Sequence, residues 1–122
     1  MTTKIIGTGS AVPDCIVTND DLAKIMDTSD EWIRSRTGIR ERRIAQAGSG
    51  TSLLAAEAAR KALENSQVAP EDLDIIILAT TSGDCSFPSG ACEVQGAIGA
   101  VNAIAFDISA ACSGFQSQLH SL

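Results

Sequence analysis

The chain has 122 residues, of which 44% are hydrophobic and 20% charged, which is typical of one folded globular domain with its own core. A net charge of -6 disfavours nucleic-acid binding. The four cysteines form no CxxC pair and the chain has one histidine, so a metal site is disfavoured as well. Neither a signal peptide nor an apolar run of membrane-spanning length is visible, so we expect a cytoplasmic protein with free thiols and no membrane partner.

The first part of the chain predicts one strand and two short helices. Residues 4–10 resemble a short strand that enters a glycine turn, and because no helix follows directly, the glycines do not form a dinucleotide fingerprint. Thr18 has an acid three residues later, which predicts a helix start. Thr28 and Glu31 repeat this spacing and predict a second helix, which Gly38 ends.

A candidate binding pair lies on the second helix. Trp32 and Arg36 are four residues apart and share a helix face, so the guanidinium group can lie near the indole ring. Such a pair can stack a flat base and bind phosphate, but a tryptophan filling a small core beside a solvated arginine fits the same residues. Five of the nine basic residues lie between Arg34 and Arg43, partly on an exposed strand at residues 39–44, and provide a local patch for an anionic ligand.

The middle of the chain predicts a helix followed by a strand. Thr51 is the expected cap of a helix from Ser52 to about Ser66, whose broad alanine-rich face permits close packing. Pro70 stands at the first position of a helical turn. The β-branched run Asp74–Thr81 is typical of a strand buried on both faces. The helix between residues 4–10 and this run predicts a βαβ crossover and a largely parallel sheet.

The last third predicts a loop, a helix, a strand and a second helix. Phe87 lies in the loop at residues 82–89, where it either anchors the loop or lines a pocket. A glycine-weakened helix is expected at Ser89–Ile98 and a strand at Ala103–Ile108.

A cysteine stands where the last strand leads into the last helix. The partial positive charge at a helix start favours the thiolate form of Cys112, and Gly114 permits close backbone approach, so the position suits a nucleophile. A buried structural cysteine is the alternative that the same residues permit.

Six blocks along the chain resemble β-ketoacyl-acyl-carrier-protein synthase III, and the match covers the whole sequence in order. The Asp-Glu-Trp-Ile, Arg-Thr-Gly-Ile and Ala-Cys-Ser-Gly-Phe segments within them are highly specific in combination. The blocks are Lys4–Ser10, Asp27–Ile33, Arg36–Arg42, Ala79–Ser82, Phe87–Ser89 and Phe106–Phe115.

The resemblance implies an α/β fold, the N-terminal part of a thiolase-like fold, with a mixed, largely parallel sheet on which the Cys112 helix packs. Residues 1–122 would then be a truncated N-terminal domain with the C-terminal half absent. The implied function is that of an acyltransferase, the initiating condensing enzyme of type II fatty acid synthesis. Cys112 would take an acyl group from acyl-coenzyme A before attack by the carbanion from malonyl-acyl-carrier protein.

The resemblance also assigns binding roles. Thr28, Trp32 and Arg36 match positions that hold the adenine and phosphate end of coenzyme A, and Thr37 lies close to the same tunnel. Phe87 matches a residue at the end of the acyl pocket, contributed across a homodimer. Coenzyme A thioester is a substrate here, so no cofactor is expected.

One departure limits what this polypeptide is expected to do alone. The family draws an enolate-stabilising His and Asn from its second half, whereas His120 lies about 12 Å along the helix from Cys112 at about 1.5 Å per residue and is expected to be a surface residue. We therefore expect no condensation by this chain alone. The alternatives are a non-catalytic self-associating fragment and a related thiolase-fold condensing enzyme of secondary metabolism; a thiol redox or metal protein is disfavoured.

Overall fold

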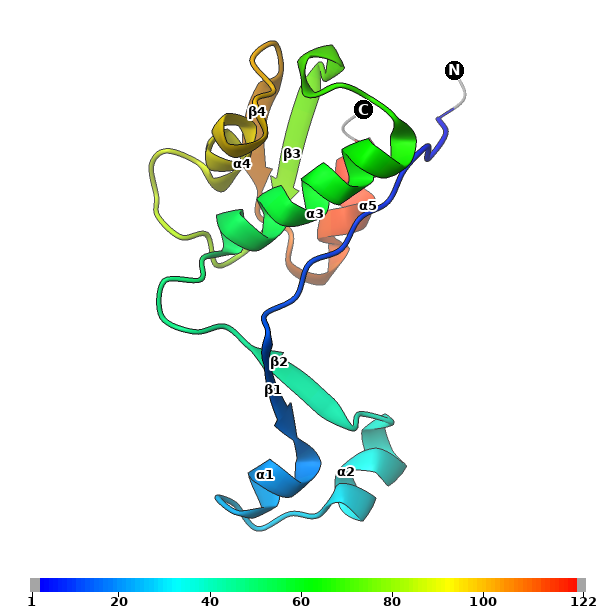
Figure 1. Cartoon of the computed structure of the whole chain (residues 1–122), viewed down its shortest axis with the longest axis vertical. Coiled ribbons are helices and arrows are strands. Elements are labelled where there is room, and N and C mark those ends of the chain that lie inside the picture. The colour runs from blue at the N-terminus through cyan, green and yellow to red at the C-terminus, as the bar shows by residue number, and fades with distance from the viewer. Residues whose placement is uncertain (1–2, 121–122) are drawn as a thin grey trace. The chain divides into compact units, whose positions relative to one another are not determined.

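The computed structural model describes residues 3–120 and divides into two compact units (Figure 1). The larger unit comprises Met1–Ala11 with Gly50–Leu122, and the smaller unit comprises Val12–Ser49. The expectation of one truncated domain over residues 1–122 stays a prediction.

The smaller unit combines a two-stranded sheet with two short helices. Its elements are β1 (Cys15–Thr18), α1 (Asn19–Ala23), α2 (Asp30–Thr37) and β2 (Glu41–Ile44). β1 and β2 pair antiparallel, so that the first residue of β1 lies opposite the last residue of β2. The sequence predicted β2 but not β1, because four residues without a strict alternation carry little strand signal.

The helix starts of this unit are capped by side chains. Thr18 forms the predicted capping box with Asp21: the hydroxyl accepts from the Asp21 amide at 3.1 Å, and the Thr18 amide donates to the Asp21 carboxylate at 3.0 Å. The Lys24 ammonium, with Thr18, holds the pKa of Asp21 well below its usual range. The expected cap at Thr28 is wrong by one residue, since Ser29 directly precedes α2 and only its hydroxyl reaches the Trp32 amide, at 3.1 Å.

The larger unit is built around a parallel pair of strands. Its elements are α3 (Thr51–Ser66), η1 (Pro70–Asp72), β3 (Ile75–Ala79), α4 (Gly90–Ile98), β4 (Ile104–Ile108), η2 (Ala111–Ser113) and α5 (Gly114–His120). β3 and β4 are parallel and joined through α4, and α4 and α5 contact both strands. The predicted α/β class with parallel pairing and a Cys112 helix on the sheet is therefore confirmed (Figure 1).

Two predictions for this unit are wrong at its first segment. The described residues 3–10 form no strand and instead run alongside α3 (Figure 1). The Thr8 amide donates to the Asn65 side chain at 3.0 Å rather than to a neighbouring strand, and a Cβ at Gly7 would lie only 2.6 Å from the Ala62 carbonyl oxygen of α3. The βαβ crossover therefore runs through α4, and not through α3 as predicted.

The predicted burial of β3 and the predicted cap of α3 also need correction. Ile75 is 40% exposed and the rest of β3 is half-buried, so the strand is not covered on both faces. The cap position of α3 is Gly50, which has no side chain, and not Thr51. The small core, in contrast, follows the prediction of alanine-mediated packing, since Ala56 of α3 meets Val94 and Ile98 of α4.

Candidate functional site

Cys112 lies in η2, the single turn that connects the end of β4 to the start of α5. Its side chain is exposed, which confirms the predicted strand-to-helix junction and contradicts the alternative of a buried structural cysteine. Ala111, directly before it, has a left-handed backbone with φ of 43°, a conformation that costs a non-glycine residue roughly 1–2 kcal/mol. The chain therefore holds a sharp, strained turn that presents the thiol at the surface of this unit.

Contacts with β3 and α4 hold this turn in place. Gly114 is buried, and a Cβ there would lie 2.8 Å from the Ala79 Cβ of β3, so a glycine is needed where α5 meets the strand. The Gln118 side chain donates to the Ile77 carbonyl oxygen at 3.0 Å. Asp107, near the end of β4, accepts hydrogen bonds from the first two amides of α4 at 2.9 and 2.7 Å.

Phe87 and His120 are the other two candidate residues in this unit. The Phe87 ring is 90% exposed, so it does not anchor its loop by packing against the described residues. His120 is exposed near the end of α5, where its Nδ1 lies 2.9 Å from the Gln116 carbonyl oxygen. This position agrees with the predicted surface histidine.

The predicted coenzyme A residues all lie in the smaller unit. The Arg36 guanidinium carbon lies 4.5 Å from the centroid of the Trp32 ring, as the spacing predicted, and Trp32 is 54% exposed rather than part of a core. Thr28 and Trp32 line one pocket of about 340 Å³ together with Asp27 and Ser29. Thr37 ends α2, and its hydroxyl donates to the Ile33 carbonyl oxygen at 2.7 Å.

No pattern in the sequence indicates Asn19, a buried polar residue that holds the start of α2. Asn19 is 1% exposed, and its amide donates to the Asp30 carboxylate and to the Ile39 carbonyl oxygen, each at 2.8 Å. Its side-chain oxygen accepts from Arg42 at 2.6 Å. Asn19 thereby joins α1 to the start of α2 and to β2. These partners lie 11, 20 and 23 residues away in sequence, which no local pattern can indicate.

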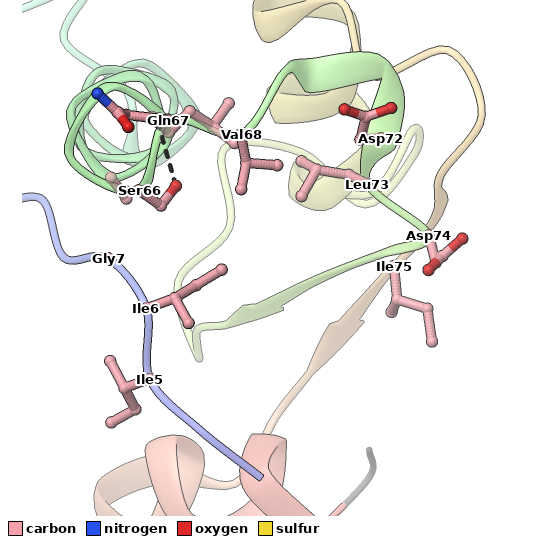
Figure 2. Close-up of a pocket in the computed structure, with 12 residues that line it drawn as sticks. Ile5, Ile6, Gly7, Ser66, Gln67, Val68, Asp72, Leu73, Asp74 and Ile75 are labelled. Carbon is pink, nitrogen blue, oxygen red and sulfur yellow. Dashed lines mark hydrogen bonds between the residues drawn. The ribbon is translucent and has the colours of Figure 1, made fainter.

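A pocket of about 760 Å³ in the larger unit contains none of the predicted site residues. Figure 2 shows Ile6 of the N-terminal segment and Val68, which follows α3, among the residues that line it. Among residues 3–120, no cluster of three or more His, Cys, Asp or Glu side chains is arranged to hold a metal ion. No helix within that range is long and apolar enough to cross a membrane.

Comparison with curated proteins finds relatives that match almost the whole chain, although no family model matches it. Beta-ketoacyl-[acyl-carrier-protein] synthase III from Caldanaerobacter subterraneus subsp. tengcongensis is 60% identical over 111 residues, which are 91% of this chain and 34% of that protein. The protein of the same name from Clostridium acetobutylicum is 61% identical over 112 residues, with 92% and 34% covered. The chain thus spans about a third of the length of the curated relatives it matches.

Solved structures show the same relationship in the fold. 3-Oxoacyl-[acyl-carrier-protein] synthase III from Aquifex aeolicus VF5 is 53% identical with a TM-score of 0.92, covering 98% of this chain and 39% of that one. The priming beta-ketosynthase from the R1128 polyketide biosynthetic pathway is 36% identical with a TM-score of 0.90, covering 95% and 35%. Its sequence and its fold together place the chain, as a portion, in the β-ketoacyl-[acyl-carrier-protein] synthase III family of thiolase-like condensing enzymes.

Proposed function

We propose that this chain carries the acyl-accepting part of the enzyme that initiates type II fatty acid synthesis, with Cys112 as the nucleophile that takes the acyl group from acyl-coenzyme A. The observation that carries the proposal is the exposed thiol on a strained turn between β4 and α5. The relatives at about 60% identity, all named synthase III, support the same reaction class.

The proposed chemistry is a transfer between two thioesters. The Cys112 thiolate attacks the thioester carbonyl carbon, and the backbone amide of Cys112 at this turn is the proposed donor to the resulting oxyanion. When the tetrahedral intermediate collapses, the bond from carbon to the coenzyme A sulfur breaks. The departing coenzyme A thiolate takes up a proton, and the acyl group stays on Cys112.

We propose that coenzyme A is held by Thr28, Trp32, Arg36 and Thr37. An exposed indole with a guanidinium on its face offers a stacking surface for adenine and a charge for phosphate, and Thr28 shares a pocket with that indole. We further propose Phe87 as a wall of the acyl pocket. Because coenzyme A is a substrate, the proposal needs no cofactor.

In the second half of the reaction, the acyl group on Cys112 is condensed with malonyl-acyl-carrier protein. We propose that the complete enzyme is a homodimer in the cytoplasm. The condensation requires donors that stabilise the malonyl enolate, and the sequence holds a single histidine on the surface of α5. We therefore propose acylation, and not condensation, as the activity of the 122-residue chain. A polyketide-type enzyme is the weaker candidate, since that structure is 36% identical against 53% for the synthase III structure.

The experiment is to incubate the purified, folded chain with acetyl-coenzyme A and to measure its intact mass and its cysteine peptides. We expect one acyl group per chain on Cys112, none in Cys112→Ala, and normal labelling in the matched control Cys92→Ala, which removes another exposed thiol. Trp32→Ala should raise the acyl-coenzyme A concentration for half-maximal labelling about fivefold, as expected for a lost contact of roughly 1 kcal/mol. A folded chain that stays unlabelled, or equal labelling of all cysteines, would refute the proposal.

A further inference from the structure

Phe87 is carried by the loop that joins β3 to α4, and its ring receives no support from packing. The ring is 90% exposed, so contacts with the described residues do not fix its position. A pocket wall nevertheless has to lie at a defined place. Within this unit, the hydrogen bonds that hold its loop are the contacts that set the position of Phe87.

The first of these attachments is made by Asp84, three residues before Phe87. Its carboxylate accepts hydrogen bonds from the Thr51 amide at 2.6 Å, from the Ser52 amide at 2.8 Å and from the Ser52 hydroxyl at 2.6 Å. Nearby, the Thr51 hydroxyl donates to the Ser82 carbonyl oxygen at 3.1 Å. These hydrogen bonds join the first turn of α3 to the start of the loop.

The sequence of α3 makes this attachment necessary for the helix as well. Its cap residue, Gly50, has no side chain to accept from the first amides, and Asp84 supplies the missing acceptor. A Cβ at Gly50 would collide with the Asp84 carboxylate, so glycine leaves the space that the carboxylate fills. The Ser52 hydroxyl and the Ser52 and Thr51 amides lower the pKa of Asp84, which keeps its charge beside the positive end of α3.

The second attachment lies at the other end of the loop. Ser89 caps α4 by accepting from the Cys92 amide, and Asp107 of β4 accepts from the Gly90 and Ala91 amides at 2.9 and 2.7 Å. Residues 85–88 therefore span two fixed points. Between them, the Cys85 thiol donates to the Pro88 carbonyl oxygen at 3.4 Å.

We propose that Asp84 is a positioning residue that holds the Phe87 loop in place and thereby sets the length of acyl chain that the site accepts. That Asp84 holds the loop rests on the hydrogen bonds alone. That it sets the acyl-chain length rests also on the proposed function. Asp107 is less suited to a test, because β4 also leads to Cys112. A substitution of Asp107 would disturb both the Phe87 loop and the Cys112 turn.

The first measurement reads the loop directly. Cys85 is exposed and adjacent to Asp84, so its alkylation rate by iodoacetamide, followed on its own peptide, reports how firmly the loop is held. Asp84→Ala should raise this rate about tenfold, because a loosened loop no longer holds the thiol in its hydrogen bonds to Pro88 and Glu93. Asp84→Asn keeps one acceptor oxygen and should fall in between. Asp72→Ala, which removes an exposed carboxylate that accepts no hydrogen bond from residues 3–120, should leave the rate unchanged. An unchanged rate in Asp84→Ala would overturn the inference.

The second measurement gives the acyl-chain selectivity of each variant. The acylation rates are divided by the folded fraction of the variant, which circular dichroism measures. The ratio of Cys112 acylation rates with acetyl- and hexanoyl-coenzyme A should shift in Asp84→Ala in the same direction as in Phe87→Ala. The double variant should show no further shift, since both changes act through the same ring. A role in stability alone would lower both rates equally and leave the ratio unchanged, which would overturn the inference. Absence of acylation in the unmodified chain would instead refute the proposed function, and the Cys85 rates would then still decide whether Asp84 holds the loop.

Discussion

At the scale of single residues, Asn19 shows how much of the smaller unit depends on one buried side chain. Its amide group makes two hydrogen bonds as a donor and one as an acceptor, to α2, to the chain before β2 and to β2 itself. Removing such a residue leaves three part-buried groups without their hydrogen-bond partner, and this costs more than the lost bonds alone.

We predict that Asn19→Ala destabilises the smaller unit by roughly 2–4 kcal/mol, the sum of three hydrogen bonds that a buried side chain makes with part-buried partners. Asn19→Asp should be at least as harmful, because it replaces a donor with a carboxylate facing Asp30 and the Ile39 carbonyl oxygen. Trp32, the single tryptophan, lies in this unit, so its fluorescence during urea unfolding measures the effect. Asn102→Ala, which removes one exposed hydrogen bond in the larger unit, is the control and should not move the Trp32 transition.

At the scale of the elements, the difference between local and remote caps explains which predictions succeed. Thr18 and Ser89 are caps within three residues of their partners, so a sequence pattern can indicate them. The cap of α3 comes from Asp84, more than thirty residues along the chain, and the sequence pointed instead to Thr51. The position of the last helix, α5, depends on its close approach to β3 at Gly114.

Gly114→Ala and Gly96→Ala should change stability in opposite directions. At Gly114 the new methyl group would meet the Ala79 Cβ, which cannot rotate away, and we expect a loss of about 1–3 kcal/mol from overpacking. At Gly96, inside α4, nothing lies within 4 Å of the new Cβ, and the higher helix propensity of alanine should add about 0.5–1 kcal/mol. Urea unfolding followed by far-ultraviolet circular dichroism measures both. A shift of the same sign for the two variants would contradict the packing of α5 on β3.

At the scale of the whole molecule, few residues are fully buried, and many large apolar side chains remain exposed. The described core of buried hydrophobic residues consists of Ala56, Ala91, Val94, Ile98 and Ala100. On α5, Phe115 is 66% and Leu119 41% exposed, four residues apart on one helix face. Exposed apolar surface of this kind favours association with another surface.

We therefore predict that the purified chain associates with itself, as the alternative of a self-associating fragment also requires. Size-exclusion chromatography with light scattering should give a mass above the 12.6 kDa of one chain. Phe115→Asp should shift the distribution toward the monomer, because it places a charge in the apolar face of α5. Val101→Asp, a matched change at a 75% exposed residue outside the helices, should have a smaller effect. A monomeric unmodified chain would contradict the prediction.

The order of the amino acids was enough to predict most of the helix positions, the junction at Cys112 and, through the motif blocks, the family. Helix periodicity, caps such as Thr18 and glycine stops such as Gly38 act over a few residues, so they are visible in the order of the amino acids. The folded chain was needed to show that β3 pairs with β4 while residues 3–10 follow α3, that Asp84 caps a distant helix and that Asn19 is buried. The reason is that a hydrogen-bond partner tens of residues away is selected by how the chain returns on itself, and no local pattern records that return.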